Sequence, residues 1–137
     1  MGAKQDELRT IADSRFGSSS PTTWYVGLST TTSNPDGSGF TEPSGANYAR
    51  VAVTNNGTNF PAATTVSGRT TKKNGAKFTF NNPSGNWGNI VEWGLFTASS
   101  GGTPKYTNPL SAPISPKNGN TPVEFDIAML ELVWGGS

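Results

Sequence analysis

The run WGNIVEWGLFT, residues 87–97, limits the possible folds more than any other part of the chain, because large apolar side chains are dense in it. In an extended strand, alternate side chains point to opposite faces. One face of this run would hold Val91, Trp93 and Leu95. The other face would hold, by the same alternation, Ile90, Glu92, Gly94 and Phe96. Both faces are mostly apolar, which is typical of a central strand in a sandwich or barrel.

The composition predicts a mainly β protein with many turns. Only 32% of the 137 residues are hydrophobic, and 17 Gly and 10 Pro accompany abundant Thr, Ser and Asn. A chain of this length suits one domain with one core. We expect a single-domain antiparallel β-sandwich, jelly-roll-like, with about seven or eight short strands. A helix or arm would occupy residues 1–20, and the sandwich would occupy residues 21–137.

One helix is expected near the N-terminus. Residues 4–16 place Leu8, Ile11 and Phe16 at or near helical spacing, and Gly17 would end the helix. A helix this short is marginal unless it is docked. Its apolar stripe is therefore expected to lie on the sheet or on a neighbouring subunit.

Several shorter segments carry strand patterns. They are residues 24–29, 48–54, 60–71, 76–80 and a segment around 105–110. In the second of these, Arg50 stands beside aromatic residues and is expected to lay its side chain over a ring.

Two polar segments carry turn signals. Residues 30–47 contain Asn34-Pro35-Asp36-Gly37 and are expected to form a long exposed loop. Residues 34–39 resemble a calcium loop only superficially, since the further acidic ligands of such a loop are missing, so a plain turn is expected. Residues 72–75, KKNG, predict a hairpin turn that leads into the strand 76–80.

The apolar alternation changes phase within residues 121–134. One phase is kept by Val123, Phe125 and Ile127, and the opposite phase by Leu130, Leu132 and Trp134. A slip near Ala128 or Met129 indicates either a bulge or a strand that passes from one packed sheet to another. We favour the second interpretation, a long bent closing strand.

The sequence argues against catalysis. It contains neither His nor Cys, so the commonest general base and the thiolate nucleophile are both missing. Glu92 is the carboxylate most expected to be buried, and a glycosidase would need Glu124 or Asp126 as its partner. A structural Glu92 paired with Lys or Arg is favoured. We therefore expect no catalytic residue, no metal site, no cofactor and no enzymatic activity.

Charge and hydropathy also exclude two kinds of partner. Ten basic residues against nine acidic ones give a net charge of +1, so neither nucleic acid nor a membrane surface is expected as a partner. No run approaches the roughly 20 apolar residues that span a bilayer. The first twenty residues lack the apolar region of a signal peptide. Synthesis without a signal peptide is expected.

Carbohydrate binding through aromatic residues is an open alternative. Most tryptophans lie in phase with aliphatic strand residues, which favours a place in the core. Trp87 and Tyr106 lie near turns instead and are the residues to test for stacking on a ligand.

The order of several motifs resembles a family of small virion proteins of tailed bacteriophages, whose members are often labelled tail-fibre or minor structural proteins. The motifs span nearly the whole chain and are, in order, Trp24-Tyr25-Val26-Gly27-Leu28-Ser29, Thr41-Glu42-Pro43-Ser44-Gly45, Tyr48-Ala49-Arg50-Val51, Phe78-Thr79-Phe80 and Trp87-Gly88 to Gly94-Leu95-Phe96. The resemblance implies a virion structural protein that is made in the cytoplasm of a host bacterium, and it carries over no catalytic residue.

Whether the sequence can build an elongated shaft bears on the protein's place in the virion. The chain has neither heptads nor a repeat that would build a fibre shaft. We expect a decoration or cement protein that binds the head exterior, stabilises the shell and forms homo-oligomers, with a trimer favoured. Its partners would be the major capsid protein or other virion proteins, and the helix residues Leu8, Ile11 and Phe16 would supply contacts. The alternative is a tail-fibre or tail-tip adhesion protein that binds host glycans through Trp87 and Tyr106.

Overall fold

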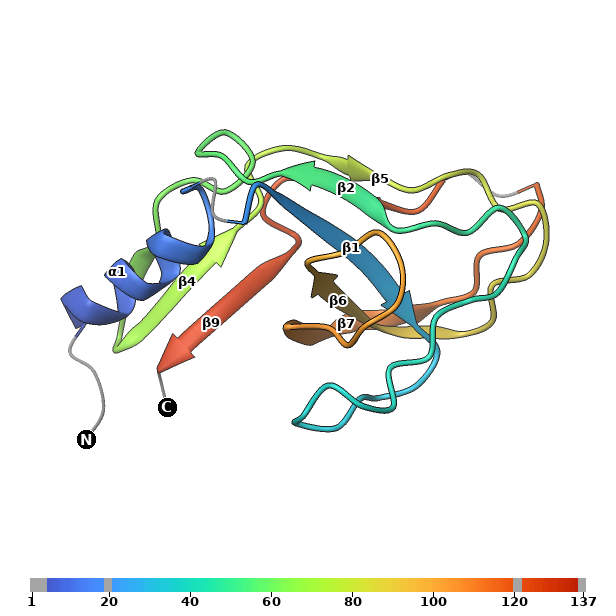
Figure 1. Cartoon of the computed structure of the whole chain (residues 1–137), viewed down its shortest axis with the longest axis horizontal. Helices are drawn as coiled ribbons and strands as arrows, with labels where there is room; N and C mark the ends of the chain where they lie inside the picture. Colours follow the sequence, from blue (N-terminus) through green and yellow to red (C-terminus); the bar gives the residue numbers. More distant parts are fainter. Residues whose placement is uncertain (1–4, 19–20, 120–121, 136–137) are drawn as a thin grey trace. The chain divides into compact units, whose positions relative to one another are not determined.

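The computed structural model describes residues 5–18, 21–119 and 122–135 of the chain. They form one helix and nine strands (Figure 1). The bounds are α1 Gln5–Arg15, β1 Thr23–Ser29, β2 Val51–Thr54, β3 Thr64–Val66, β4 Arg69–Lys73, β5 Phe78–Thr79, β6 Ile90–Phe96, β7 Tyr106–Ile114, β8 Glu124–Phe125 and β9 Glu131–Gly135. The described strands form sheets with the orders β2-β1-β6-β7, β3-β4-β9 and β5-β8. The prediction of a mainly β, antiparallel fold with a short N-terminal helix is confirmed.

The chain divides into two compact units. The boundaries fall between residues 23 and 24, 52 and 53, 77 and 78, and 124 and 125. The first unit contains α1, β3, β4 and β9, and the second contains β6, β7 and nearly all of β1. The predicted division into an arm over residues 1–20 and a sandwich over residues 21–137 stays a prediction.

Strand β6 is central in the sheet of the second unit, between β1 and β7. Leu28 of β1 faces Trp93 of β6 across the antiparallel ladder, and Gly27 faces Gly94. Trp93 is buried, and so are its neighbours on both sides of the strand. The run 87–97 therefore contains the central core strand of this unit, as the alternation of its side chains predicts.

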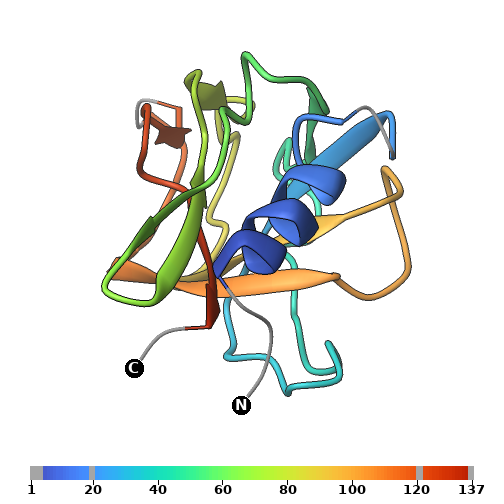
Figure 2. The same cartoon turned by 90° about the vertical axis from the view of Figure 1, so that its left-hand side faces the viewer.

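Helix α1 packs on β4 and also contacts β3 and β9 (Figure 2). Ala12 and Phe16 are fully buried on this side of the helix, and the Phe16 ring lies 5.3 Å from that of Phe60. The helix ends where Gly17 takes a positive φ of 96° and donates its N–H to the Asn55 Oδ1 at 2.6 Å. The helix thus packs on the sheet, one of the two expected resting places, although Ile11 of the predicted stripe is 39% exposed.

The hairpin turn predicted at residues 72–75 is wrong. Lys72 and Lys73 belong to β4, and the β3–β4 hairpin turns at Ser67 and Gly68, which both have positive φ. The Lys72 Nζ reaches the Asp13 carboxylate of α1 at 2.7 Å, and the lysine side chain is only 2% exposed. The Asp13 side chain is 46% exposed, so the buried lysine reaches a carboxylate at the surface of the unit instead of standing at an exposed turn.

Residues 121–134 do not form one continuous strand. A turn separates β8 from β9, and Ala128 within it has a φ of 68°. Strand β8 pairs with β5, whereas β9 pairs with β4, so the chain does pass between two sheets where the apolar phase changes. Ile127 was expected to face inward, but it is 61% exposed because it lies in this turn.

Candidate functional site

A charged network in the second unit joins four of the motifs that mark the sequence. Arg50 donates from Nε and Nη2 to the two carboxylate oxygens of Glu42, at 2.9 and 2.7 Å. The Tyr48 hydroxyl donates to the same carboxylate at 2.7 Å and accepts the Leu28 N–H. The Arg50 guanidinium carbon lies 3.4 Å from the centroid of the Phe96 ring, so the expected placement of Arg50 over an aromatic ring is confirmed.

The network explains why a glycine stands at position 27. A Cβ on Gly27 would lie 2.9 Å from the Phe96 ring, 3.0 Å from the Glu42 carboxylate and 3.2 Å from the Tyr48 hydroxyl. Burial, and then the hydrogen bond to Glu42, raise the pKa of Tyr48 far above its ordinary value. The Tyr48 hydroxyl therefore stays protonated and can donate its hydrogen bond to Glu42. Through Glu42, the network holds the residue that directly follows the neighbouring loop.

That loop, residues 30–41, is ordered by its own hydrogen bonds. Asn34 donates its N–H to the Ser38 carbonyl, and Ser38 donates both its N–H and its hydroxyl to Asp36. These bonds lower the pKa of Asp36. At the base of the loop, the Thr30 N–H donates to the Thr41 carbonyl. The expectation of a long exposed loop is thus only partly correct, because this part has a defined conformation and a buried glycine, Gly37.

At Gly37 the loop contacts a second turn, at Thr103 and Pro104. A Cβ at this position would approach the Pro104 carbonyl oxygen to 3.0 Å, and the φ of Gly37 is 88°. A small pocket forms beside this contact, and its lining consists of Asn34, Pro35, Gly37, Pro104, Lys105, Tyr106 and Thr107. The Tyr106 ring is half-buried and packs edge-on against Trp24, with 5.8 Å between the ring centroids. We call this concavity the Tyr106 pocket.

Glu92 lies beneath the same loop. Its side chain is buried, as predicted, and its Oε1 accepts the Ser33 N–H at 3.2 Å. The expected Lys or Arg partner is replaced by this backbone donor. The two carboxylates considered as catalytic partners are engaged elsewhere: Glu124 accepts the Thr79 hydroxyl, and Asp126 accepts the Ile127 N–H. Among the described residues, no group of three His, Cys, Asp or Glu side chains is arranged to hold a metal ion.

The residues predicted to bind a partner fall into different environments. The side chain of Leu8 lies outside the described part of the structure, and Ile11 is 39% exposed. Phe16 and Trp87 are buried, and the Trp87 indole N–H donates to the Ala46 carbonyl at 2.8 Å. A partner would reach these two rings only if their surroundings moved. Tyr106 is the predicted residue that lines the pocket described above.

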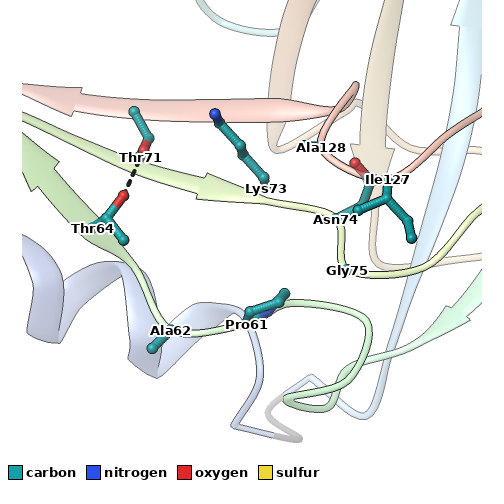
Figure 3. A pocket seen from close by; sticks show the side chains of 9 residues that line it. All are labelled: Pro61, Ala62, Thr64, Thr71, Lys73, Asn74, Gly75, Ile127 and Ala128. Atoms are coloured by element: carbon teal, nitrogen blue, oxygen red, sulfur yellow. Dashed lines mark hydrogen bonds between the residues drawn. The ribbon is translucent and has the colours of Figure 1, made fainter.

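A larger concavity lies in the first unit, where no sequence motif pointed to one (Figure 3). It measures about 330 Å³ and is lined by Pro61, Ala62, Thr64, Thr71, Lys73, Asn74, Gly75, Ile127 and Ala128. We call it the Pro61–Ile127 groove. It brings residues 61–75 together with residues 127 and 128, which lie far away in sequence, so periodicity within one segment gave no signal for it. In the described ranges, no helix is long and apolar enough to cross a membrane.

Comparison with known proteins identifies the family. No curated protein matches the chain. A family model described as "Podophage GP4 fiber I protein gp80" matches residues 10–133. The resemblance to small virion proteins of tailed bacteriophages is confirmed by this match. The chain therefore belongs to this family of phage fibre proteins and is a structural protein of the virion.

Proposed function

We propose that this protein is a non-enzymatic subunit of a tail fibre, carried on the exterior of the virion, and that it contacts host-surface sugars. The observation that carries the proposal is the match of residues 10–133 to a family described by a fibre protein. This family description favours the tail over the head exterior.

The engagement of the carboxylates supports a structural rather than a catalytic role. Glu42 accepts hydrogen bonds from Tyr48 and Arg50, and Glu92 accepts one from a backbone N–H. Asp13 is paired with Lys72. A general acid or base must instead reach a substrate proton within hydrogen-bond distance. Each of these carboxylates already holds parts of the fold together.

The Tyr106 pocket supports sugar binding at a defined place. It places Tyr106 in one lining with the polar residues Asn34 and Thr107. Aromatic rings with a polar handle suit ligands that have an apolar face and hydroxyl groups. Because the loop is already ordered by its own bonds, a ligand would lose less free energy in ordering it. The ammonium of Lys105 is exposed and forms no ion pair with the described residues, so it can donate to a sugar oxygen.

Gold-labelled antibodies on intact particles test the location. The expected result is label on the tail, with a copy number by quantitative mass spectrometry far below that of the major capsid protein. Label over the head would instead support the second candidate, a capsid decoration protein. One observation favours this capsid decoration role: the described helix, α1, has only 11 residues and is too short to form a fibre shaft.

A glycan array with polysaccharides from the host surface tests the sugar site. Tyr106→Ser should abolish selective binding, and Tyr106→Phe should retain most of it because the ring is kept. Lys117→Ala is the matched control, since Lys117 is exposed and outside the pocket. Thermal unfolding of each variant checks that the fold is kept. Equal binding by Tyr106→Ser and the unaltered protein would contradict the assignment.

A further inference from the structure

The Pro61–Ile127 groove is open, and its lining is largely apolar (Figure 3). Pro61 and Ala62 form one side, and Ile127 and Ala128 of the β8–β9 turn lie on another. Ile127 is 61% exposed, and Met129 in the same turn is 59% exposed. Of these two, Ile127 lines the groove together with Pro61, Ala62 and Ala128. An exposed apolar surface of this kind is typical of an interaction site.

The polar groups of the groove are already engaged. The buried Asn74 side chain donates to the carbonyls of Ala76 and Asp126 and accepts the Leu130 N–H. The hydroxyls of Thr64 and Thr71 hydrogen-bond to each other at 3.2 Å, as Figure 3 shows. The Lys73 ammonium lies 3.5 Å from the Glu131 carboxylate. The groove therefore fits an uncharged, apolar occupant rather than an ion or an acidic peptide.

The chain itself presents a segment with this chemistry. Residues 109–114, PLSAPI, contain no charge and form the end of β7, at the edge of its sheet. The β6–β7 register shifts between Ile90 and Glu92, so residues 110–113 stand opposite Val91 alone. Most of the segment is exposed, including both prolines, and Ile114 is 37% exposed. A bulged edge with prolines cannot continue the ladder of its own sheet.

We infer that the Pro61–Ile127 groove of one copy receives residues 109–114 of the next copy. This inference rests on the proposed fibre role, because a fibre contains repeated copies of the same chain. The two surfaces differ, so the contact is head-to-tail. Such a contact closes into a ring, including the predicted trimer, or continues as a filament.

Engineered disulfides test the contact directly, because the chain contains no Cys. Ala62 and Ser111 are both exposed. Ala62→Cys and Ser111→Cys, mixed as two single variants and mildly oxidised, should give a cross-linked dimer on a non-reducing gel. The double variant should give longer ladders or a closed oligomer. Ala62→Cys mixed with Ser99→Cys, an exposed site in another turn, is the control and should stay uncross-linked. Cross-linking in the control, or a disulfide confined within single chains, would overturn the inference.

Light scattering on the purified protein gives an independent readout. Ile127→Asp should reduce the measured mass to that of one chain, while Val66→Asp should leave the assembly intact. Val66 is the matched control because it is 72% exposed and does not line the groove. Circular dichroism verifies that both variants fold. A monomeric unaltered protein at every concentration tested would refute the contact. This readout is made in solution, so it does not depend on where the protein lies in the virion.

Discussion

Single polar side chains in the interior bind segments of this protein that are distant in sequence. Asn55 is fully buried, accepts the Gly17 N–H and donates to the carbonyls of Arg15 and Pro21. Asn74 holds the β8–β9 turn in a similar way. Buried polar groups remain favourable only when such partners are present. Both asparagines bond to residues far away in sequence, so no local pattern predicts these bonds.

Glycine at position 27 is required by packing rather than by backbone conformation. We predict that Gly27→Ala lowers the free energy of unfolding by about 1–3 kcal/mol, because the new methyl group overpacks the Glu42–Tyr48–Phe96 cluster. Gly57→Ala is the control, since no heavy atom lies within 4 Å of a Cβ there. Urea denaturation measures both. Equal stability of the two variants would contradict the packing explanation.

Asp13 links stability to pH. Burial raises its pKa, but the hydrogen bonds from Lys72 and from the Ala63 N–H outweigh burial, so the pKa lies below the ordinary value of 3.8. The Asp13 carboxylate therefore binds a proton more readily in the unfolded state than in the folded state. The stabilisation is present above pH 3.8 and is lost as the pH falls through the folded-state pKa.

The Asp13→Asn variant measures this linkage. Denaturation midpoints from neutral pH to below pH 3.8 should fall less steeply for Asp13→Asn than for the unaltered protein. Asp36→Asn serves as the comparison, because Asp36 has a lowered pKa but lies on the surface in a single loop. Parallel curves for Asp13→Asn and the unaltered protein would exclude the linkage.

At the scale of elements, strand β6 carries the core of the second unit, and β4 carries the sheet of the first. We predict that Trp93→Ala destabilises the protein by about 3–5 kcal/mol, since a large buried side chain leaves a cavity. Val66→Ala, at a 72% exposed position, should change stability by less than about 0.5 kcal/mol. Thermal and urea unfolding compare them. A Trp93→Ala protein of normal stability would show that β6 is not the core strand.

At the scale of the whole molecule, neither unit is a continuous stretch of chain. A cut after residue 77 separates β4 from its partner β9 and β1 from its partner β6. We predict that fragments 1–77 and 78–137 are each unfolded when made separately. Amide dispersion in NMR spectra, with the full chain as the control, measures this. Native-like dispersion in either fragment would contradict the interleaved assembly.

The sequence determined the local properties of this protein. Its alternation placed β6 in a core, its helical spacing placed α1, and the lack of His and Cys argued against the commonest catalytic groups. These properties follow from neighbours within one element, where side-chain direction repeats with a fixed period. The order of the motifs also indicated the phage family, which the family match confirms.

Tertiary structure alone decided which distant segments meet. Lys72 is a strand residue because it pairs with Leu132 of β9, and its ammonium meets Asp13 of α1 at 2.7 Å. Nothing near these residues in sequence encodes either contact. The Tyr106 pocket and the Pro61–Ile127 groove arise in the same way, from loops brought together by sheet pairing. Such contacts depend on long-range packing, in which many weak local preferences compete, and only the complete fold selects among them.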